Sequence, residues 1–190
     1  MSKTDNEKRR EEFVNAAEEL FKQNGIVDTT VNAIVKQMDV AKGLFYYYFN
    51  SKDDVIDAIS AKYNRTFRQT IQNAVNSQDD YEQRLNEFLE GTIRSFRTLW
   101  ENLNGENENI DLSILSSRTL EEAKATASEA LKKLLQEGDD SGKLHIKDPD
   151  DFAKVIVSGI ADLARQAEAD GKKILDMMED LIKGSGKGEN

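Results

Sequence analysis

Lysine and tyrosine side chains cluster in residues 42–52, where their types and spacing could bind phosphate. Lys42 and Gly43 precede Tyr46 and Tyr47, and Lys52 closes the segment. Ammonium and phenol groups donate hydrogen bonds to phosphate and sugar oxygens, and a lysine can also donate to guanine O6 and N7. Successive helical residues point about 100° apart, so the tyrosine run that ends at Tyr48 cannot lie wholly in one core. We therefore expect one or two of these rings to face solvent or a partner.

Each of these residues also has an ordinary structural interpretation. An aromatic run more often belongs to a hydrophobic core, a lysine such as Lys52 is often a plain surface residue, and Thr30 alone is only a helix cap. Their joint spacing around one turn favours the nucleic-acid interpretation.

Three short helices in residues 1–52 would position these side chains. Phe13, Ala17 and Phe21 mark the apolar stripe of a first helix, which ends at Asn24-Gly25. Thr29 or Thr30 caps a second helix, and residues 38–40 form a tight turn before a third helix over residues 41–48. Two helices joined by a short turn predict a helix-turn-helix, whose second helix can enter the major groove.

The charge distribution permits contact with DNA through this segment. The chain of 190 residues has a net charge of -10, which taken whole argues against nucleic-acid binding. Residues 1–52 hold eight basic and eight acidic residues and are neutral, so residues 53–190 carry the whole negative charge. A neutral head can bind DNA if its basic groups share a face, and an acidic body is repelled from it.

Residues 13–55 resemble the DNA-binding head of the TetR family of bacterial regulators. The matching pieces are Ala16-Ala17, Leu20-Phe21, Gly25, Thr29-Thr30-Val31, Ile34-Val35, Val40-Ala41-Lys42-Gly43, Tyr46-Tyr47-Tyr48-Phe49, Ser51-Lys52 and Val55. The resemblance implies a homodimer that binds a palindromic DNA operator, usually as a repressor, and is released by a small-molecule effector. It also implies base contacts from Lys42, Gly43 and Leu44, and phosphate or sugar contacts from Thr30, Tyr46, Tyr47 and Lys52.

Two departures from the family pattern affect this expectation. Ala41 stands where the family often has serine, so the third helix lacks a side-chain cap. Leu44-Phe45 replaces a commoner threonine-leucine pair, so base preference cannot be copied from relatives. Asp39, near the expected DNA side, would reduce affinity.

The rest of the chain continues in helical periodicity, and the sequence predicts an all-α fold of about nine helices. A three-helix head over residues 1–52 would be followed by a ligand-binding and dimerisation bundle over residues 53–183. Residues 184–190 would form a flexible tail. The predicted helices of the bundle cover residues 51–76, 81–103, 110–116, 119–137, 149–170 and 172–183.

The last two predicted helices suggest how two copies associate. The helix over residues 149–170 is apolar on most sides, and the final helix repeats the pattern, so a second copy is expected to cover part of both. The alternative is a pair of fully internal helices. The predicted interface residues are Phe152, Ile156, Gly159, Ile160, Leu163, Ile174, Met178 and Leu181.

Signals for an effector pocket, a cofactor or catalysis are weak. Phe67, Phe88, Phe96 and Trp100 could line a pocket for an unknown small molecule, although plain core is the ordinary interpretation. With one histidine and no cysteine, we expect no metal site, and we expect no cofactor and no enzymatic activity because no catalytic motif occurs.

Because long apolar runs and a signal peptide are missing, we expect a cytoplasmic protein with no membrane partner. A protein-interaction module that has lost DNA affinity remains the main competing function.

Overall fold

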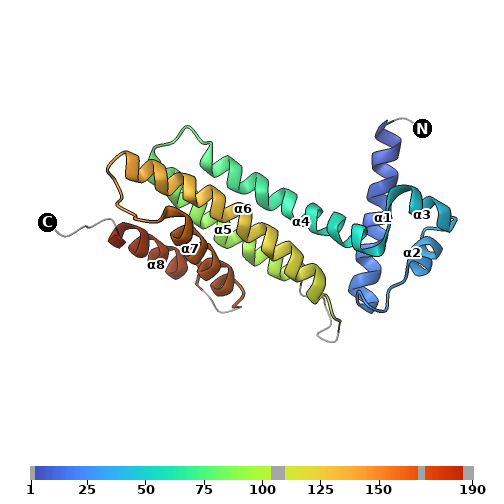
Figure 1. Ribbon diagram of the computed structural model, residues 1–190. Coiled ribbons are helices and arrows are strands. Elements are labelled where there is room, and N and C mark those ends of the chain that lie inside the picture. The colour runs from blue at the N-terminus through green and yellow to red at the C-terminus, as the bar shows by residue number, and fades with distance from the viewer. Residues whose placement is uncertain (1–2, 104–109, 167–169, 186–190) are drawn as a thin grey trace. The chain divides into compact units, whose positions relative to one another are not determined.

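The computed structural model describes residues 3–103, 110–166 and 170–185, and its regular structure in these ranges is entirely helical (Figure 1). None of the helices in this part of the chain is long and apolar enough to cross a membrane. The all-α prediction is confirmed. The eight helices of the described ranges are α1 (Lys3–Asn24), α2 (Val31–Gln37), α3 (Lys42–Tyr48), α4 (Lys52–Val75), α5 (Tyr81–Leu103), α6 (Ser113–Asp140), α7 (Pro149–Ala164) and α8 (Gly171–Ser185).

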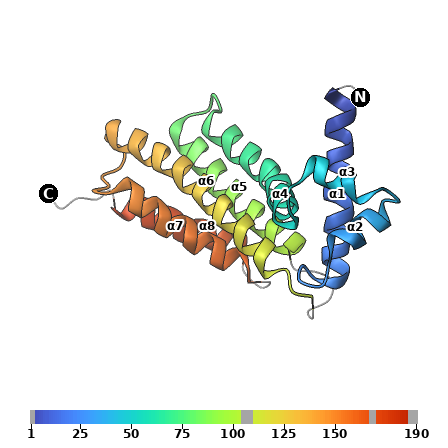
Figure 2. The ribbon, with the colours of Figure 1, turned by 45° about the vertical axis from the view of Figure 1, so that its right-hand side comes forward.

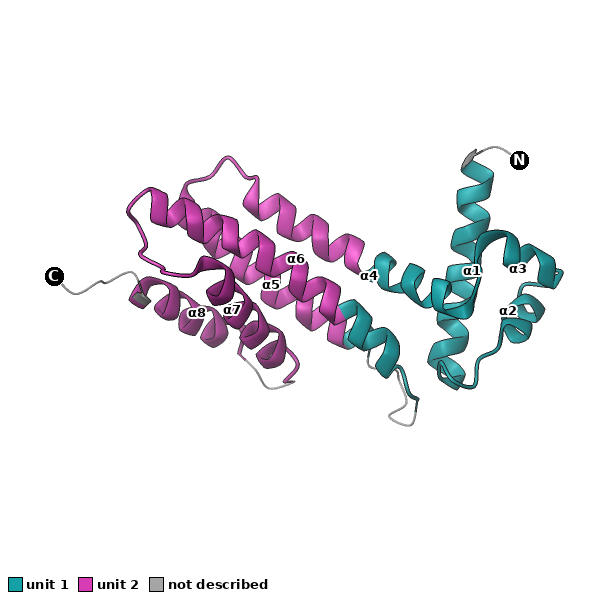
Figure 3. Cartoon of the chain, viewed as in Figure 1, with its two compact units in different colours: residues 1–63, 101–119 teal, residues 64–100, 120–190 magenta. Residues whose placement is uncertain are grey.

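The chain divides into two compact units, which Figure 3 colours separately. The head unit comprises residues 1–63 and 101–119, and the bundle unit comprises residues 64–100 and 120–190. Helices α4, α5 and α6 therefore contribute residues to both units. The expected functional boundary after residue 52 stays a prediction.

Aromatic packing holds the three short helices of the head unit together. Phe13 of α1 and Phe45 of α3 are fully buried, and their rings meet edge to face with centroids 5.8 Å apart. Ile34 of α2 is also fully buried. After α1 ends, Gly25 adopts a φ of 83° and its N–H donates to the Phe21 carbonyl at 2.8 Å, which is the predicted left-handed cap.

A largely buried carboxylate joins α1 to α4 within the head unit. Glu18 accepts hydrogen bonds from Lys22 Nζ at 2.9 Å, from Lys62 Nζ at 2.7 Å and from the Tyr63 hydroxyl. Burial by itself raises the pKa of Glu18, but the bonds from Lys62, Tyr63 and Lys22 outweigh it and lower the pKa to about 2. The ionised carboxylate thus fixes the side of α1 against the fourth helix.

The bundle unit is built around the aromatic residues of α4 and α5. Phe67 and Phe96 are buried, with ring centroids 4.9 Å apart. Trp100 of α5 donates its Nε1–H to the Ala161 carbonyl of α7 at 3.0 Å. Figure 2 shows α7 and α8 beside one another, and the two helices are in contact.

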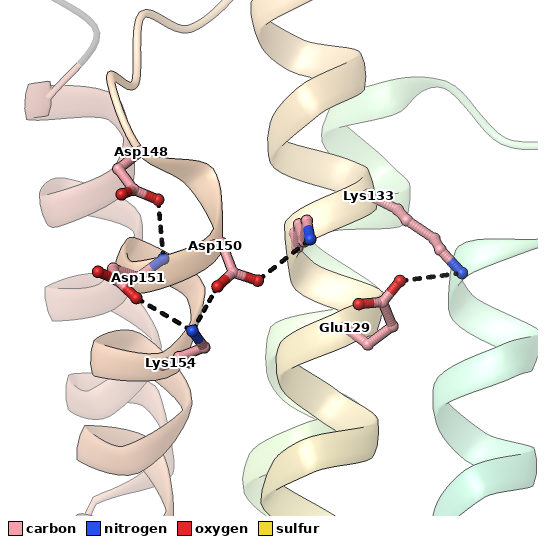
Figure 4. A network of polar contacts seen from close by, with 7 residues as sticks. Glu129, Lys133, Asp148, Asp150, Asp151 and Lys154 are labelled. Atoms are coloured by element: carbon pink, nitrogen blue, oxygen red, sulfur yellow. Dashed lines mark hydrogen bonds and ion pairs between the residues drawn. The ribbon is translucent and has the colours of Figure 1, made fainter.

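Polar contacts fix the start of α7 against α6 (Figure 4). Asp148 caps the helix by accepting from the Asp151 N–H at 3.1 Å, and Pro149 occupies the first turn. Lys132 of α6 lies 3.1 Å from the Asp150 carboxylate. Lys154 pairs with both Asp150 and Asp151.

The structure differs from the predicted elements in four places. The predicted helices over residues 110–116 and 119–137 are one helix, α6, within which the buried Thr119 hydroxyl donates to the Leu115 carbonyl at 2.8 Å. That helix also continues through Gly138, where a Cβ would overlap the Tyr81 hydroxyl and lie 2.8 Å from Leu144 Cδ1. Helix α7 ends at Ala164, before the predicted residue 170. Helix α8 runs into the predicted tail, whose residues 186–190 lie outside the described ranges.

Candidate nucleic-acid interface

Helices α2 and α3 are joined by the tight turn that the sequence predicts. Thr30 caps α2, its hydroxyl oxygen accepting from the Ala33 N–H at 3.1 Å, and its side chain is exposed. Asp39 has a φ of 52°, a left-handed conformation that aspartate tolerates better than most residues. The Val40 N–H then donates to the Val35 carbonyl at 3.0 Å, which fixes the direction in which α3 leaves the turn.

The structure resolves which aromatic residues of α3 enter the core. Phe45 is fully buried, whereas Tyr46 is 49% exposed and Tyr47 is 69% exposed. Tyr48 is half-buried beside the Phe13 ring, and its buried hydroxyl has no hydrogen-bond partner among the residues that the structure describes. Phe45 therefore anchors α3, and two phenol groups remain on the outer face.

The first turn of α3 is open to a partner. Among the described residues, no heavy atom other than those of its chain neighbours and its own helix backbone lies within 4 Å of the Cβ position of Gly43. Packing among these residues therefore does not require glycine there. Ala41 makes no side-chain cap, as its residue type predicts. Lys42 is exposed, with its Nζ 6.0 Å from the centroid of the Tyr46 ring. Lys42, Gly43 and Tyr46 thus share an accessible surface, while Leu44 is half-buried.

Lys52 lies at the first residue of α4, and its ammonium faces the connection between α1 and α2. Its Nζ donates to the carbonyls of Ile26 at 2.6 Å and Thr29 at 2.9 Å, and lies 3.4 Å from the carbonyl of Val27. An ammonium has three N–H donors, so these acceptors occupy its hydrogen-bonding capacity. The expected phosphate contact would require Lys52 to leave these carbonyls.

Arg10 is a basic residue of this region that the motif comparison did not single out. Its guanidinium lies over the Phe49 ring, 4.7 Å from the centroid, and the residue is exposed on α1. Its charge was visible in the sequence, but the stacking brings together residues that are far apart in the chain.

The four aromatic residues considered for an effector pocket lie in the bundle unit. Phe67, Phe88 and Phe96 are all at most 3% exposed, and Trp100 is half-buried with its indole N–H bonded to Ala161. The structure brings Phe67 and Phe96 into direct contact. Two surface grooves formed by described residues of the bundle unit are lined by other residues.

The residues predicted for a dimer interface separate into two groups. Ile156, Ile160, Ile174 and Met178 are buried within the chain itself, at most 4% exposed. The others are at least partly accessible: Phe152, Gly159 and Leu163 on α7, and Leu181, 50% exposed, on α8. Two further exposed apolar residues, which the sequence did not single out, are Val155 at 69% and Met177 at 44%.

Part of the head unit is similar in sequence to a known family of proteins. Residues 13–59 match the family model described as bacterial regulatory proteins, tetR family. Over 65 residues, 34% of this chain, the sequence is 35% identical to the HTH-type transcriptional regulator HbdR of Aromatoleum sp. (strain CIB). The chain covers 28% of that relative and between 26% and 39% of three other curated HTH-type regulators.

Solved structures share the fold along nearly the whole chain. A regulator of the TetR/AcrR family from Thermobifida fusca YX-ER1 aligns with a TM-score of 0.67 at 20% identity, covering 96% of this chain and all of that one. SmeT, the repressor of the Stenotrophomonas maltophilia multidrug efflux pump SmeDEF, aligns with a TM-score of 0.67 at 22% identity, covering 91% of this chain and 89% of SmeT. A complex of SmeT with triclosan aligns equally well. The likeness to the tetR family of bacterial regulatory proteins therefore covers residues 13–59 by sequence and nearly the whole chain by fold.

Proposed function

We propose that this protein is a DNA-binding transcriptional regulator that binds a palindromic operator as a homodimer and represses transcription. The observation that carries the proposal is the outer face of α3, where Lys42, Gly43, Tyr46 and Tyr47 are accessible while Phe45 holds the helix in the core. This arrangement suits a recognition helix in the major groove.

The chemistry of this face suggests a division of roles. Lys42 and Gly43 lie in the first turn of α3, where recognition helices commonly approach base edges, and Lys42 can donate to guanine. Tyr46 and Tyr47 can donate their hydroxyls to phosphate oxygens. Thr30 can do the same at the start of α2, because its oxygen accepts from Ala33 while its hydroxyl hydrogen is a separate donor.

The accessible apolar residues of α7 and α8 support a homodimer. Phe152, Val155, Gly159 and Leu163 recur at spacings of three or four residues, so they form one stripe along α7. In the described part of the chain, no heavy atom beyond its chain neighbours and its own helix backbone lies within 4 Å of the Gly159 Cβ position, which leaves room for another backbone to approach. A two-fold axis through such a stripe would bury it in both copies and set the distance between the recognition helices.

A small-molecule effector is the proposed control of DNA binding. SmeT, which shares the fold, has been solved with triclosan, so this architecture can hold a small organic molecule. For the present chain, Phe67, Phe88, Phe96 and Trp100 remain the proposed pocket residues, and the effector itself is unidentified. The curated relatives are transcriptional regulators, and we propose that this chain has no enzymatic activity and acts in the cytoplasm.

Selection from a random duplex library tests the proposal. Bound sequences from the purified full chain are enriched, sequenced and measured by fluorescence anisotropy beside a Lys42→Ala, Tyr47→Ala variant. A Lys147→Ala, Lys173→Ala variant is the control, since both lysines are exposed and lie outside the head unit. We expect a palindrome, a loss of affinity of at least tenfold in the first variant, and little change in the control. No enrichment at low salt would reject the proposal in favour of a protein-interaction module.

A further inference from the structure

A cleft on the bundle unit combines positive charge with an apolar floor. It lies between α5 and the start of α8, and its volume is about 400 Å³. Small-molecule sites in proteins commonly have volumes of roughly 300–1,000 Å³, so the cleft can accommodate a compact ligand. The residues lining it are Glu90, Ile93, Arg94, Arg97, Gly171, Lys172, Leu175 and Asp176.

Basic side chains outnumber acidic ones in the lining of this cleft. Arg94, Arg97 and Lys172 line it against two carboxylates, in a chain whose overall charge is -10. Arg94 lies 3.7 Å from Glu90, too far for a strong charged hydrogen bond, so a ligand carboxylate can compete for it. The guanidinium of Arg97 lies 3.9 Å from the Cβ position of Gly171, so Arg97 of α5 and the first residue of α8 adjoin at this cleft.

The floor of the cleft favours a ligand with an apolar body. Ile93 is 4% exposed and Leu175 is half-buried, and these two residues form the apolar part of the cleft lining, here called its floor. An inorganic anion would leave this floor in contact with water, whereas an organic anion would cover it. We propose that the cleft binds a small organic carboxylate with a compact apolar body.

The residues of α8 that line the cleft lie on a different side of the helix from the proposed dimer contacts. At about 100° per residue, Gly171, Lys172, Leu175 and Asp176 lie on one side of α8. The exposed Met177 and Leu181 lie on nearly the opposite side, while Ile174, Met178 and Ile182 face the core between the two sides. A second copy that covers Met177 and Leu181 therefore does not need to cover the cleft.

Calorimetric titration of the full chain with octanoate tests the site without DNA. Octanol and acetate serve as controls, since octanol lacks the charge and acetate lacks the apolar body. We expect octanoate to bind, both controls to bind at least tenfold more weakly, and an Arg94→Gln, Lys172→Gln variant to lose at least tenfold in affinity. A Lys147→Gln, Lys173→Gln variant removes the same charge outside the cleft and is expected to bind like the parent.

Several results would overturn the proposal. These are an absence of octanoate binding, equal binding of octanol, or equal losses in the two double variants. All four substituted residues are exposed, and circular dichroism checks that each variant keeps the helical fold. A role for such an anion as effector rests on the proposed function. The titration itself does not, so carboxylate binding and operator binding can fail separately.

Discussion

Substitution of Gly43 by alanine is predicted to stabilise the protein while weakening its binding to DNA. Alanine is favoured over glycine inside a helix by about 0.5–1 kcal/mol. The open space around the Gly43 Cβ position adds no steric cost, and the site lies in the first turn, which favours the lower end of that range. At roughly 2–4 °C per kcal/mol for a chain of this size, the melting temperature should rise by about 1–3 °C.

The same substitution at Gly138 is the matched control for stability. A Cβ there would overlap the Tyr81 hydroxyl and lie 2.8 Å from Leu144 Cδ1, so Gly138→Ala must displace packed side chains. Overpacking of this kind typically costs about 1–3 kcal/mol, and the melting temperature should fall. One methyl group thus changes stability in opposite directions at two helical glycines of the same chain.

Operator binding is the second measurement on these two variants. If α3 lies in the major groove, the methyl group of Gly43→Ala occupies space beside the base edges, and anisotropy should show at least a tenfold loss of affinity. The Gly138→Ala variant should retain operator affinity below its melting temperature. Unchanged affinity in Gly43→Ala would refute the argument that its open space is reserved for DNA. A lowered melting temperature of Gly43→Ala would refute the conclusion that a Cβ at this position of α3 meets no steric hindrance.

Three further predictions concern the tether of Lys52, the carboxylate of Glu18 and the dimer. Lys52→Gln should lower stability by about 1–3 kcal/mol, because its bonds to backbone carbonyls are lost, and should leave the salt dependence of operator binding unchanged. If Lys52 contacted a phosphate in the parent, the slope of log affinity against log salt concentration would instead be smaller by about one in the variant. In the parent, Glu18 has a pKa near 2, below the usual 4.5. The ionised carboxylate therefore stabilises the folded state fully above about pH 4.5, and this stabilisation is lost as the pH falls toward 2. Glu18→Gln should flatten that part of the pH–stability curve, which is measured by urea titration at each pH. The change should be at most about 3 kcal/mol, because the lysine partners of Glu18 are partly solvated. A curve that is the same in parent and variant would contradict this prediction. Val155→Glu with Leu181→Glu should convert a dimer to a folded monomer in light-scattering chromatography, and a persisting dimer would move the interface elsewhere.

Features with a local physical cause were predictable from the sequence. The cap at Gly25 and the turn at Asp39 follow from residues that tolerate positive φ, and both occur where expected. The N-cap at Asp148 with Pro149 is equally local. By contrast, the continuation of α6 through Gly138 places that residue against Tyr81, which lies more than fifty positions earlier in the chain.

Which residues of the largely apolar helix α7 are buried and which are accessible was the least predictable feature of the candidate sites. Hydrophobicity alone could not separate the face of α7 that packs inside the chain from the face that remains accessible. Ile156 and Ile160 were therefore predicted together with Gly159, although the isoleucines are buried and Gly159 faces open space. Val155 was not among the predicted interface residues, because its exposure depends on where the neighbouring helices lie.

Lys52 shows why residue type and motif do not determine a role by themselves. A lysine at the start of a helix, one turn after a tyrosine run, suits a phosphate contact as well as an internal tether, because both are hydrogen bonds from an ammonium to oxygen. The three carbonyls come from residues 26–29, more than twenty positions earlier in the chain, so the sequence offers no signal for them. Since Thr30 follows directly, the tether fixes the start of α2 against α4. Lys52 can therefore influence DNA affinity by positioning the helix-turn-helix, even if its ammonium never touches a phosphate.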